Sequence, residues 1–574
     1  MPSPSLKAGS RPPWVGLGAA VWVQIASGNS YTFPLYSPLL KSVLGLSQQQ
    51  LTILGVASDI GESLGFLPGI ACNKFPPWAV LLVGCVLCFL GYGVIWLVVS
   101  GTIGSFPFVA NFAHYSQGLK TLKMRVQLWI TLFIAANSNA WFGTAVLVTN
   151  MRNFPLSRGT VAGILKGYIG LSAAVYTVLY STVLQDSALN LLLFLALGIP
   201  VLCLALMYFI RPCTPASGED SSEHVHFIFT IAVSVLLAIY LITVTIVQQL
   251  VSLSDAISYI LVAIMVILLL APLTIPVKMT LFPSRARAES SDRLAPEEGA
   301  TQTDPLLTPS SSATHLGSFL EAEYASDIET LIAIGEGAVK KKRRPKRGED
   351  FKFQEAFIKA DFWLLWFLYF LGVGSGITVL NNLSQIGIAL GASNTTILLS
   401  LFSFCNFVGR LGSGAVSEHF LRTKTVPRTV WMACAHVVML ISFVLYALAI
   451  SGTLYVATAL FGICYGAQYS LMVPTASELF GLKNFAVIYS FMGLGNPIGA
   501  VLFSVLLAGD VYDAEAAKQG GSTCVGSACF GLTFIVLAIA CGLGFILSVI
   551  LTIRVRPVYQ MLYAGGSFRL PSSH

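Results

Sequence analysis

The sequence predicts an all-α, polytopic membrane protein, and its composition, mean hydropathy and apolar runs support this prediction. Of the 574 residues, 55% are hydrophobic and 10% are charged, whereas soluble domains usually carry about 25% charged residues. The mean hydropathy of +0.77 indicates a chain whose main solvent is the bilayer. The apolar runs are about 20 to 25 residues long, which is the length of a helix that crosses a bilayer; barrel strands would alternate over about 10 residues.

Apolar runs of helix length recur along the chain and predict about 12 to 14 transmembrane helices. They lie at 14–36, 50–72, 78–100, 126–150, 158–182, 189–211, 226–250, 257–281, 362–382, 394–417, 428–450, 453–475, 484–507 and 529–553.

The basic residues between these runs predict the orientation of the chain. A cytoplasmic N-terminus places most of them on the cytoplasmic side: Lys74, Arg152, Arg158, Arg211, Lys278, Arg285, Arg422, Lys424, Arg428, Lys483, Arg554 and Arg556. The opposite segments 183–188, 251–256, 383–393 and 451–453 contain no Lys or Arg. This asymmetry predicts that both termini are cytoplasmic, in a plasma or vacuolar membrane. Segment 101–125 departs from the pattern, and we interpret it as either a genuine loop or an insertion.

A long polar segment at 283–356 divides the chain. It is rich in Ser, Thr, Pro and acidic residues, contains the basic cluster 340–347, and has too little apolar content to fold alone. Six spans plus two precede it and six follow, which is the layout of a transporter with two six-helix bundles and two extra helices. The predicted domains are a cytoplasmic N-terminus at 1–13, a transmembrane domain at 14–282, a disordered cytoplasmic linker at 283–356, a six-helix bundle at 357–556 and a cytoplasmic tail at 557–574.

Longer motifs carry a family resemblance. They are WVQ at 22–24, SGNSY at 27–31, ASDIGE at 57–62, NMRNF at 150–154, RGTVAGILKGY at 158–168, NNLSQIG at 381–387, YGAQ at 465–468 and SELFGLK at 477–483. In these motifs the chain resembles the plant nodulin-like branch of the major facilitator superfamily, which includes the plant proteins called nuclear fusion defective. The resemblance covers nearly the whole chain apart from 101–125 and the linker. It implies a membrane carrier distantly related to oxalate/formate and monocarboxylate transporters.

The resemblance also implies a cytoplasmic gate. Segment 409–428 is similar to the superfamily's gating motif between the second and third helices of a bundle. This similarity implies a gating role for Arg410, with Glu418 as its partner if the chain turns between them. The equivalent turn of the first half, at 73–75, lacks the usual acidic residue and second basic residue, so a symmetric gate is not expected.

Asp59, Glu62 and Lys166 are ionisable residues inside predicted spans, where charges are costly and therefore point to function. Asp59 and Glu62 are three residues apart and share one helix face. They are candidates for proton coupling; the alternative is that they pair structurally with a basic residue on a neighbouring helix. Lys166 is a candidate for pairing with an anionic substrate, or for neutralising one of these carboxylates.

Amide side chains form a further candidate set. In the superfamily, the first and fourth helices of each bundle face the substrate cavity, and most of these amides fall on those helices. The candidates for cavity lining are Gln24, Asn29, Asn137, Asn139, Asn381, Asn382, Gln468 and Asn496. The alternative is that each amide holds neighbouring helices together by hydrogen bonds.

Other side chains exclude some functions and suggest one crosslink. Cys524 and Cys529 lie in a polar, Gly-rich loop and are candidates for a disulfide if that loop faces an oxidising compartment. No phosphate-binding Gly-Lys-Ser loop and no metal-binding spacing of His, Glu or Cys occurs, so we expect no enzyme activity, cofactor or metal. The net charge of +7 does not indicate nucleic-acid binding, because the one dense basic run is short and lacks aromatic residues.

The sequence therefore predicts a secondary active transporter. It would move a small organic solute by alternating access, with a proton-coupled organic anion or monocarboxylate as the most specific interpretation. Its expected partners are membrane lipid, a small-molecule substrate and protons. The alternative is a receptor or scaffold that has a transporter fold and does not transport.

Overall fold

The computed structural model describes residues 11–44, 48–102, 117–213, 221–250, 254–281, 348–392, 395–449, 452–520 and 524–562. Every regular element in these ranges is a helix, and eleven of the helices are long and apolar enough to cross a membrane. The predicted all-α, polytopic fold is confirmed. Predictions on 282–347, including the basic cluster, lie outside the described residues, as does 103–116 of segment 101–125.

The N-terminal bundle is built from six predicted spans, three of which consist of several helical segments. In chain order the helices are α1 (Arg11–Ala26), η1 (Asn29–Thr32), α2 (Phe33–Leu44), α3 (Gln48–Ser63), α4 (Phe66–Lys74), α5 (Pro77–Val99), α6 (Gln117–Asn153), α7 (Arg158–Thr182), α8 (Ala188–Leu193), η2 (Phe194–Gly198) and α9 (Ile199–Leu206). Helices α1, α3 and α5 pack against α6, so α6 lies at the centre of this bundle.

The break between α3 and α4 has a clear physical basis. Asn137 of α6 donates hydrogen bonds to the carbonyls of Gly61, at 2.9 Å, and Leu64, at 3.1 Å. These bonds satisfy acceptors near the end of α3, which is necessary where water is scarce. The break leaves Glu62 and Ser63 at the end of α3, facing the C-terminal half of the molecule.

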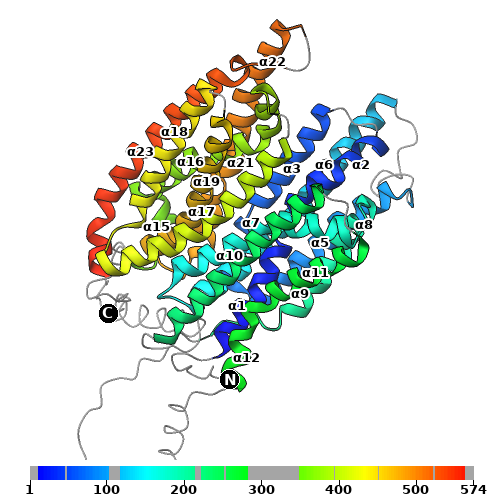
Figure 1. Cartoon of the computed structure of the whole chain (residues 1–574). Helices are drawn as coiled ribbons and strands as arrows, with labels where there is room; N and C mark the ends of the chain where they lie inside the picture. Colours follow the sequence, from blue (N-terminus) through cyan, green and yellow to red (C-terminus); the bar gives the residue numbers. More distant parts are fainter. Residues whose placement is uncertain are drawn as a thin grey trace, which may run out of the picture.

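The two extra helices pack on the outside of the N-terminal bundle. They are α10 (Ser221–Leu250) and a second span made of α11 (Asp255–Leu270), η3 (Ala271–Leu273) and α12 (Thr274–Leu281). Helix α10 contacts α7 and also α17 of the C-terminal bundle, while α12 contacts α1. Figure 1 shows α10 lying along the line where the two bundles meet.

The C-terminal bundle follows the linker. Its helices are α15 (Phe353–Phe357), α16 (Ala360–Ala389), α17 (Thr395–Lys424), α18 (Arg428–Leu448), α19 (Thr453–Phe480), α20 (Phe485–Gly493), α21 (Gly495–Gly499), η4 (Ala500–Gly509), α22 (Asp510–Lys518) and α23 (Ala528–Leu562). Figure 1 shows α1 beginning and α23 ending at the same end of the molecule, which we call the terminal face; α22 lies at the opposite end, the distal face.

Two predicted domain boundaries shift in the structure. Phe351, assigned to the disordered linker, is buried, and its N–H donates to the carbonyl of Phe480 at 3.0 Å. At the other end, α23 continues past the predicted start of the tail at 557, and Val558 and Tyr559 are buried. Both segments carry aromatic or β-branched side chains, which pack under the C-terminal bundle.

The bundles meet most closely where α7 crosses α17. A Cβ atom on Gly414 would lie 2.7 Å from the carbonyl oxygen of Gly159 and 2.9 Å from the Cα of Gly163. These are backbone atoms, so the two helices would have to separate. Small residues at such crossings allow close backbone packing within a membrane.

This crossing gives a first prediction. We expect Gly414→Ala to destabilise the protein by about 1–3 kcal/mol, because the added methyl overpacks a backbone contact. The control is Gly412→Ala, two residues away on α17, where nothing lies within 4 Å of the added carbon. Thermal unfolding of the purified protein in detergent checks the prediction, and equal melting temperatures for the two variants would contradict it.

Candidate functional site

A cavity lies between the two bundles, near the helix breaks at α3–α4 and α20–α21. Its volume is about 90 Å³, enough for several water molecules. The N-terminal bundle lines it with Ser27, Glu62, Ser63, Asn139, Thr144 and Lys166, among others, and the C-terminal bundle with Tyr369, Tyr469, Met472, Tyr489, Ser490 and Asn496. Because both bundles form its wall, a solute held here would contact both halves of the molecule.

Glu62 is the carboxylate of this cavity. Ser30 Oγ donates to Glu62 Oε2 at 2.6 Å, and both Lys166 and Arg410 interact electrostatically with the carboxylate. Asp59, one turn earlier on α3, interacts electrostatically with Glu62. Asp59 is not among the side chains that line the cavity, so of the two predicted carboxylates only Glu62 reaches it.

Lys166 connects the two bundles across the cavity. It lies on α7, is 9% exposed, and its Nζ donates to the hydroxyl of Tyr489 on α20. The Nζ atom also lies 5.2 Å from the centroid of the Tyr489 ring. Within the described part of the chain, no carboxylate forms an ion pair with Lys166.

Arg410 lies behind the cavity wall. Its guanidinium donates to Asn406 Oδ1 at 3.0 Å and to the backbone carbonyl of Lys166 at 3.0 Å, and its Cζ lies 4.9 Å from the ring centroid of Tyr469. The side chain is buried, and no ion pair to it is formed by the described carboxylates. Lys166 and Arg410 are therefore two cations whose charges both act on Glu62.

The structure separates Arg410 from Glu418, its predicted partner. Helix α17 is continuous from Thr395 to Lys424, so Glu418 lies two turns beyond Arg410. The chain does not turn between them, and the condition for their pairing is not met. Arg410 lies behind the wall of the central cavity, whereas Glu418 lies at the terminal face.

Two of the eight candidate amides line the cavity. Asn139 is 4% exposed, and neither of its amide atoms has a hydrogen-bond partner among the described residues. Asn496 Nδ2 donates to Ser63 Oγ at 3.4 Å, while its Oδ1 is buried without a partner in the same part of the chain. Buried polar atoms of this kind require a partner, so both amides are suited to a polar solute or to water.

The remaining amides do not line the cavity, and most of them bind elsewhere. Asn29 accepts from Tyr92 at 2.8 Å, Asn137 braces the α3–α4 break, Asn382 donates to Ser504 at 2.9 Å, and Gln468 donates to the carbonyl of Met432 at 3.2 Å. Gln24 is fully buried, and its Oε1 accepts from Ser27 at 3.1 Å, whereas Asn381 is exposed on α16. For Asn29, Asn137, Asn382 and Gln468 the structure supports the alternative role, in which the amides hold neighbouring helices together.

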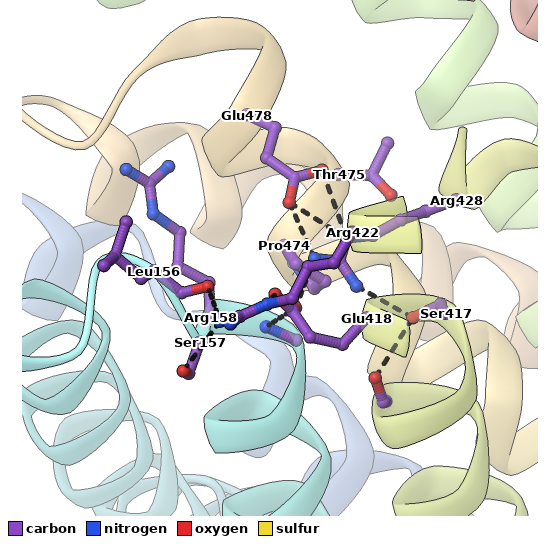
Figure 2. Close-up of polar contacts among 12 residues, drawn as sticks. Leu156, Ser157, Arg158, Ser417, Glu418, Arg422, Arg428, Pro474, Thr475 and Glu478 are labelled. Atoms are coloured by element: carbon purple, nitrogen blue, oxygen red, sulfur yellow. Dashed lines mark hydrogen bonds and ion pairs between the residues drawn. The ribbon is translucent and has the colours of Figure 1, made fainter. Parts of the chain in front are cut away.

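A second polar cluster lies at the terminal face, and we call Glu418, Arg422, Arg428 and Glu478 the terminal gate (Figure 2). Arg428 donates to both oxygens of Glu478, at 2.9 and 3.1 Å, and to Glu418 Oε2 at 2.6 Å. The side chains of Arg428 and Glu478 are completely buried. Arg422 donates to Glu418 Oε1 at 3.1 Å. The four charges are thus paired, as buried charges must be.

The terminal gate contacts the N-terminal bundle directly. Glu418 Oε2 accepts from the N–H of Gly159 at 3.1 Å, in the first turn of α7, where the helix dipole favours a negative charge. Arg422 Nη2 donates to the carbonyl of Leu156 and to Ser157 Oγ. Figure 2 shows Arg422 reaching from α17 to the segment that precedes α7. These contacts hold the two bundles together at the terminal face.

The equivalent turn of the first half is built differently. Arg152 of α6 donates to Asn73 Oδ1 at 3.0 Å and to the carbonyl of Lys483 at 3.2 Å. Within the described residues, 73–75 takes part in no ion pair. The charged cluster at the terminal face is therefore contributed by the C-terminal half.

Sequence reasoning did not identify several of these residues. It used Arg428 only as a marker of orientation and as the last residue of the gating segment 409–428, and Glu478 only as part of a motif, although an acidic residue at the end of an apolar run signals a buried ion pair. It also left out Tyr369, Tyr469 and Tyr489. No local signal separates these three from the other aromatic residues, because the rotation of each helix decides which of them face the cavity.

Cys524 and Cys529 are joined by a disulfide with a Cα–Cα distance of 5.8 Å. It lies between α22 and α23, on the distal face, and both cysteines are buried. The crosslink closes the turn in which α23 begins.

Solved structures of the same architecture are transporters. A double-tryptophan mutant of XylE is 12% identical, covers 95% of this chain and 98% of its own, and has a TM-score of 0.54. XylE bound to 6-bromo-6-deoxy-D-glucose, described as a major facilitator superfamily proton:xylose symporter, is 11% identical, covers 93% and 94%, and has a TM-score of 0.51. The fold is therefore that of a transporter of the major facilitator superfamily.

Sequence comparisons show the family. The family model described as Nodulin-like matches residues 13–277, and the model of the NFD4 C-terminal domain matches 349–561. Protein NUCLEAR FUSION DEFECTIVE 4 of Arabidopsis thaliana is 30% identical over 569 residues, which are 96% of this chain and 90% of that protein. The chain belongs to the nodulin-like family, as its motifs predicted.

Proposed function

We propose that the protein is a secondary active transporter that moves a small organic anion together with a proton by alternating access. One observation carries the proposal: Lys166 and the half-buried carboxylate of Glu62 line one cavity shared by both bundles, and the buried Arg410 lies directly behind Lys166. The unpartnered amide of Asn139 adds hydrogen-bonding capacity to the same cavity.

Charge balance links the anion to the proton. When Asp59 and Glu62 are both ionised, their two negative charges offset the positive charges of Lys166 and Arg410. A proton on Glu62 leaves one positive charge in excess, and a monovalent anion restores neutrality. A buried site of low dielectric favours neutral combinations of charges. Two forms of the site are neutral: the empty, deprotonated form and the form that holds both a proton and an anion. These are the forms in which the protein is best able to switch from one access state to the other.

Alternating access requires that the two bundles separate on one face at a time. The terminal gate and the Arg152 contacts hold the terminal face closed. The state described here is thus closed towards the chain termini, and transport requires these contacts to break.

We also propose that the terminal face is cytoplasmic, so that both termini lie in the cytoplasm of a cell whose plasma or vacuolar membrane holds the protein. The excess of Lys and Arg in loops of this face supports the orientation. The Cys524–Cys529 disulfide then lies on the opposite side, where disulfides persist. A glycosylation acceptor inserted at 521–523 should be glycosylated in microsomes and one in the C-terminal tail should not; the reverse pattern would overturn the orientation.

The proposed function is tested by uptake of labelled monocarboxylates into proteoliposomes with an inward proton gradient. We expect saturable uptake that the gradient stimulates. If folded protein takes up none of a broad panel of monocarboxylates, the anion assignment is wrong, and the receptor or scaffold interpretation is favoured instead.

Lys166→Gln gives a sharper form of the test. Loss of the cation removes the charge that attracts the anion, so we expect KM for the transported anion to rise by at least tenfold, equivalent to about 1.4 kcal/mol of binding. The matched control is Lys278→Gln, an exposed lysine on α12 far from the cavity, which should leave KM unchanged. An unchanged KM in Lys166→Gln would remove Lys166 from the substrate site.

A further inference from the structure

The extra helix α10 reaches the contact between the terminal gate and the N-terminal bundle. Glu223, in the first turn of α10, accepts a hydrogen bond from Ser157 Oγ at 2.7 Å. The same Ser157 Oγ accepts a hydrogen bond from Arg422 Nη2 at 3.0 Å. A serine hydroxyl has one proton, so donating it to Glu223 turns the oxygen lone pairs towards Arg422.

Helix α10 is fixed to the N-terminal bundle at this end. The ring of Phe227, one turn beyond Glu223, lies 4.9 Å from that of Trp14 on α1 and 5.4 Å from that of Phe154, which follows α6. Phe227 and Trp14 are both buried. Glu223 is therefore carried by the same half of the molecule as Ser157, while Arg422 belongs to the other half.

The carboxylate of Glu223 lies next to neutral groups that accept hydrogen bonds from Arg422. The Leu156 carbonyl and the Ser157 hydroxyl, which both accept hydrogen bonds from Arg422, are neutral groups. The turn at 73–75 lacks the acidic residue expected of a gate in the first half. Glu223 places a carboxylate directly behind Ser157, and hydrogen bonds to charged groups are stronger when they polarise one another.

We propose that Glu223 is a positioning residue of the terminal gate, through which the extra helices stabilise the state closed at the terminal face. It orients the Ser157 hydroxyl and adds a negative charge opposite Arg422. The inference rests on the proposed alternating access, because it assigns α10 to one of the two states of that cycle.

The experiment measures how far apart the bundles lie at the terminal face. Spin labels are attached through noncanonical amino acids at positions 74 and 424, which are exposed lysines on the N- and C-terminal halves. Distances between the labels in full-length protein in nanodiscs give the ratio of closed to open molecules. We expect Glu223→Gln to lower this ratio by about tenfold, as for one lost hydrogen bond to a charged group. Glu223→Asp should restore part of it.

A double-mutant cycle separates positioning from general stabilisation. In an Arg422→Gln background, Glu223→Gln should change the ratio no further, because the group that it acts on is gone. A full, additive effect in that background would overturn the inference, as would no effect of Glu223→Gln alone. Ser157→Ala offers a second route, with the same expected shift.

The control is Asp255→Asn, an exposed carboxylate at the other end of the extra helix pair, which should leave the ratio unchanged. This experiment needs no substrate. If uptake fails but Glu223→Gln has no further effect in the Arg422→Gln background, the proposed solute is wrong and the role of Glu223 stands. If uptake is normal but the two substitutions have additive effects, the role of Glu223 is wrong and the proposed solute stands.

Discussion

Glu62→Gln is expected to abolish proton-driven accumulation of the anion while the protein stays folded. The glutamine is close in shape to a protonated glutamate and can still accept a hydrogen bond from Ser30, but it cannot release a proton. The substitution keeps the cavity in its positively charged form. This form binds the anion, but without the anion the cavity is not neutral, so the empty transporter cannot return to its starting state. We expect gradient-driven uptake to fall by about 100-fold or more, in the range typical of lost proton-transfer groups.

Exchange of internal for external anion distinguishes this mechanism from simple damage. Exchange needs only the loaded form, so Glu62→Gln should retain it without any proton gradient. The matched control is Glu515→Gln on α22, where the carboxylate pairs with the exposed Lys518 away from the cavity. If Glu62→Gln still accumulates anion in response to the gradient, Glu62 is not the coupling residue.

The second large effect is expected from Arg428→Met. Its guanidinium pairs with two buried carboxylates, Glu418 and Glu478, and neither can be left charged and unpaired without a large penalty. Removing one partner of a buried pair typically costs about 3–5 kcal/mol. We expect a melting temperature lower by several degrees, or failure to fold.

Two comparisons test this account of the terminal gate. Lys518→Met breaks an ion pair in which the lysine is 69% exposed, and exposed pairs contribute about 0–1 kcal/mol, so little change is expected. The double variant Arg428→Met, Glu478→Gln should be more stable than Arg428→Met alone, because one stranded charge is removed. A melting temperature for Arg428→Met equal to that of Lys518→Met would contradict the buried-pair interpretation.

The fold was largely predictable because the bilayer imposes simple rules. Hydrophobic length located the spans from 78–100 to 529–553, and motifs identified the family. The first two spans were harder to anticipate, since each is divided into shorter helices: η1 separates α1 from α2, and the break at Gly65 separates α3 from α4. Such breaks depend on partners such as Asn137, which lies more than 70 residues away in sequence.

The site was only partly predictable, because spacing does not fix helix rotation. Asn137 and Asn139 are two residues apart and therefore lie on opposite sides of α6. One braces α3, and the other faces the cavity. Spacing of three was more informative: Asp59 and Glu62 lie one turn apart and interact, although only Glu62 reaches the cavity.

Proton movement that accompanies anion movement is the most direct test of the central claim. A pH-sensitive dye is sealed inside proteoliposomes that contain the protein, and a transported monocarboxylate is then added outside. We predict that the lumen acidifies as labelled anion enters, with about one proton for each anion, and that Glu62→Gln removes the acidification. Anion entry at the normal rate without any change of internal pH would contradict coupling through this carboxylate.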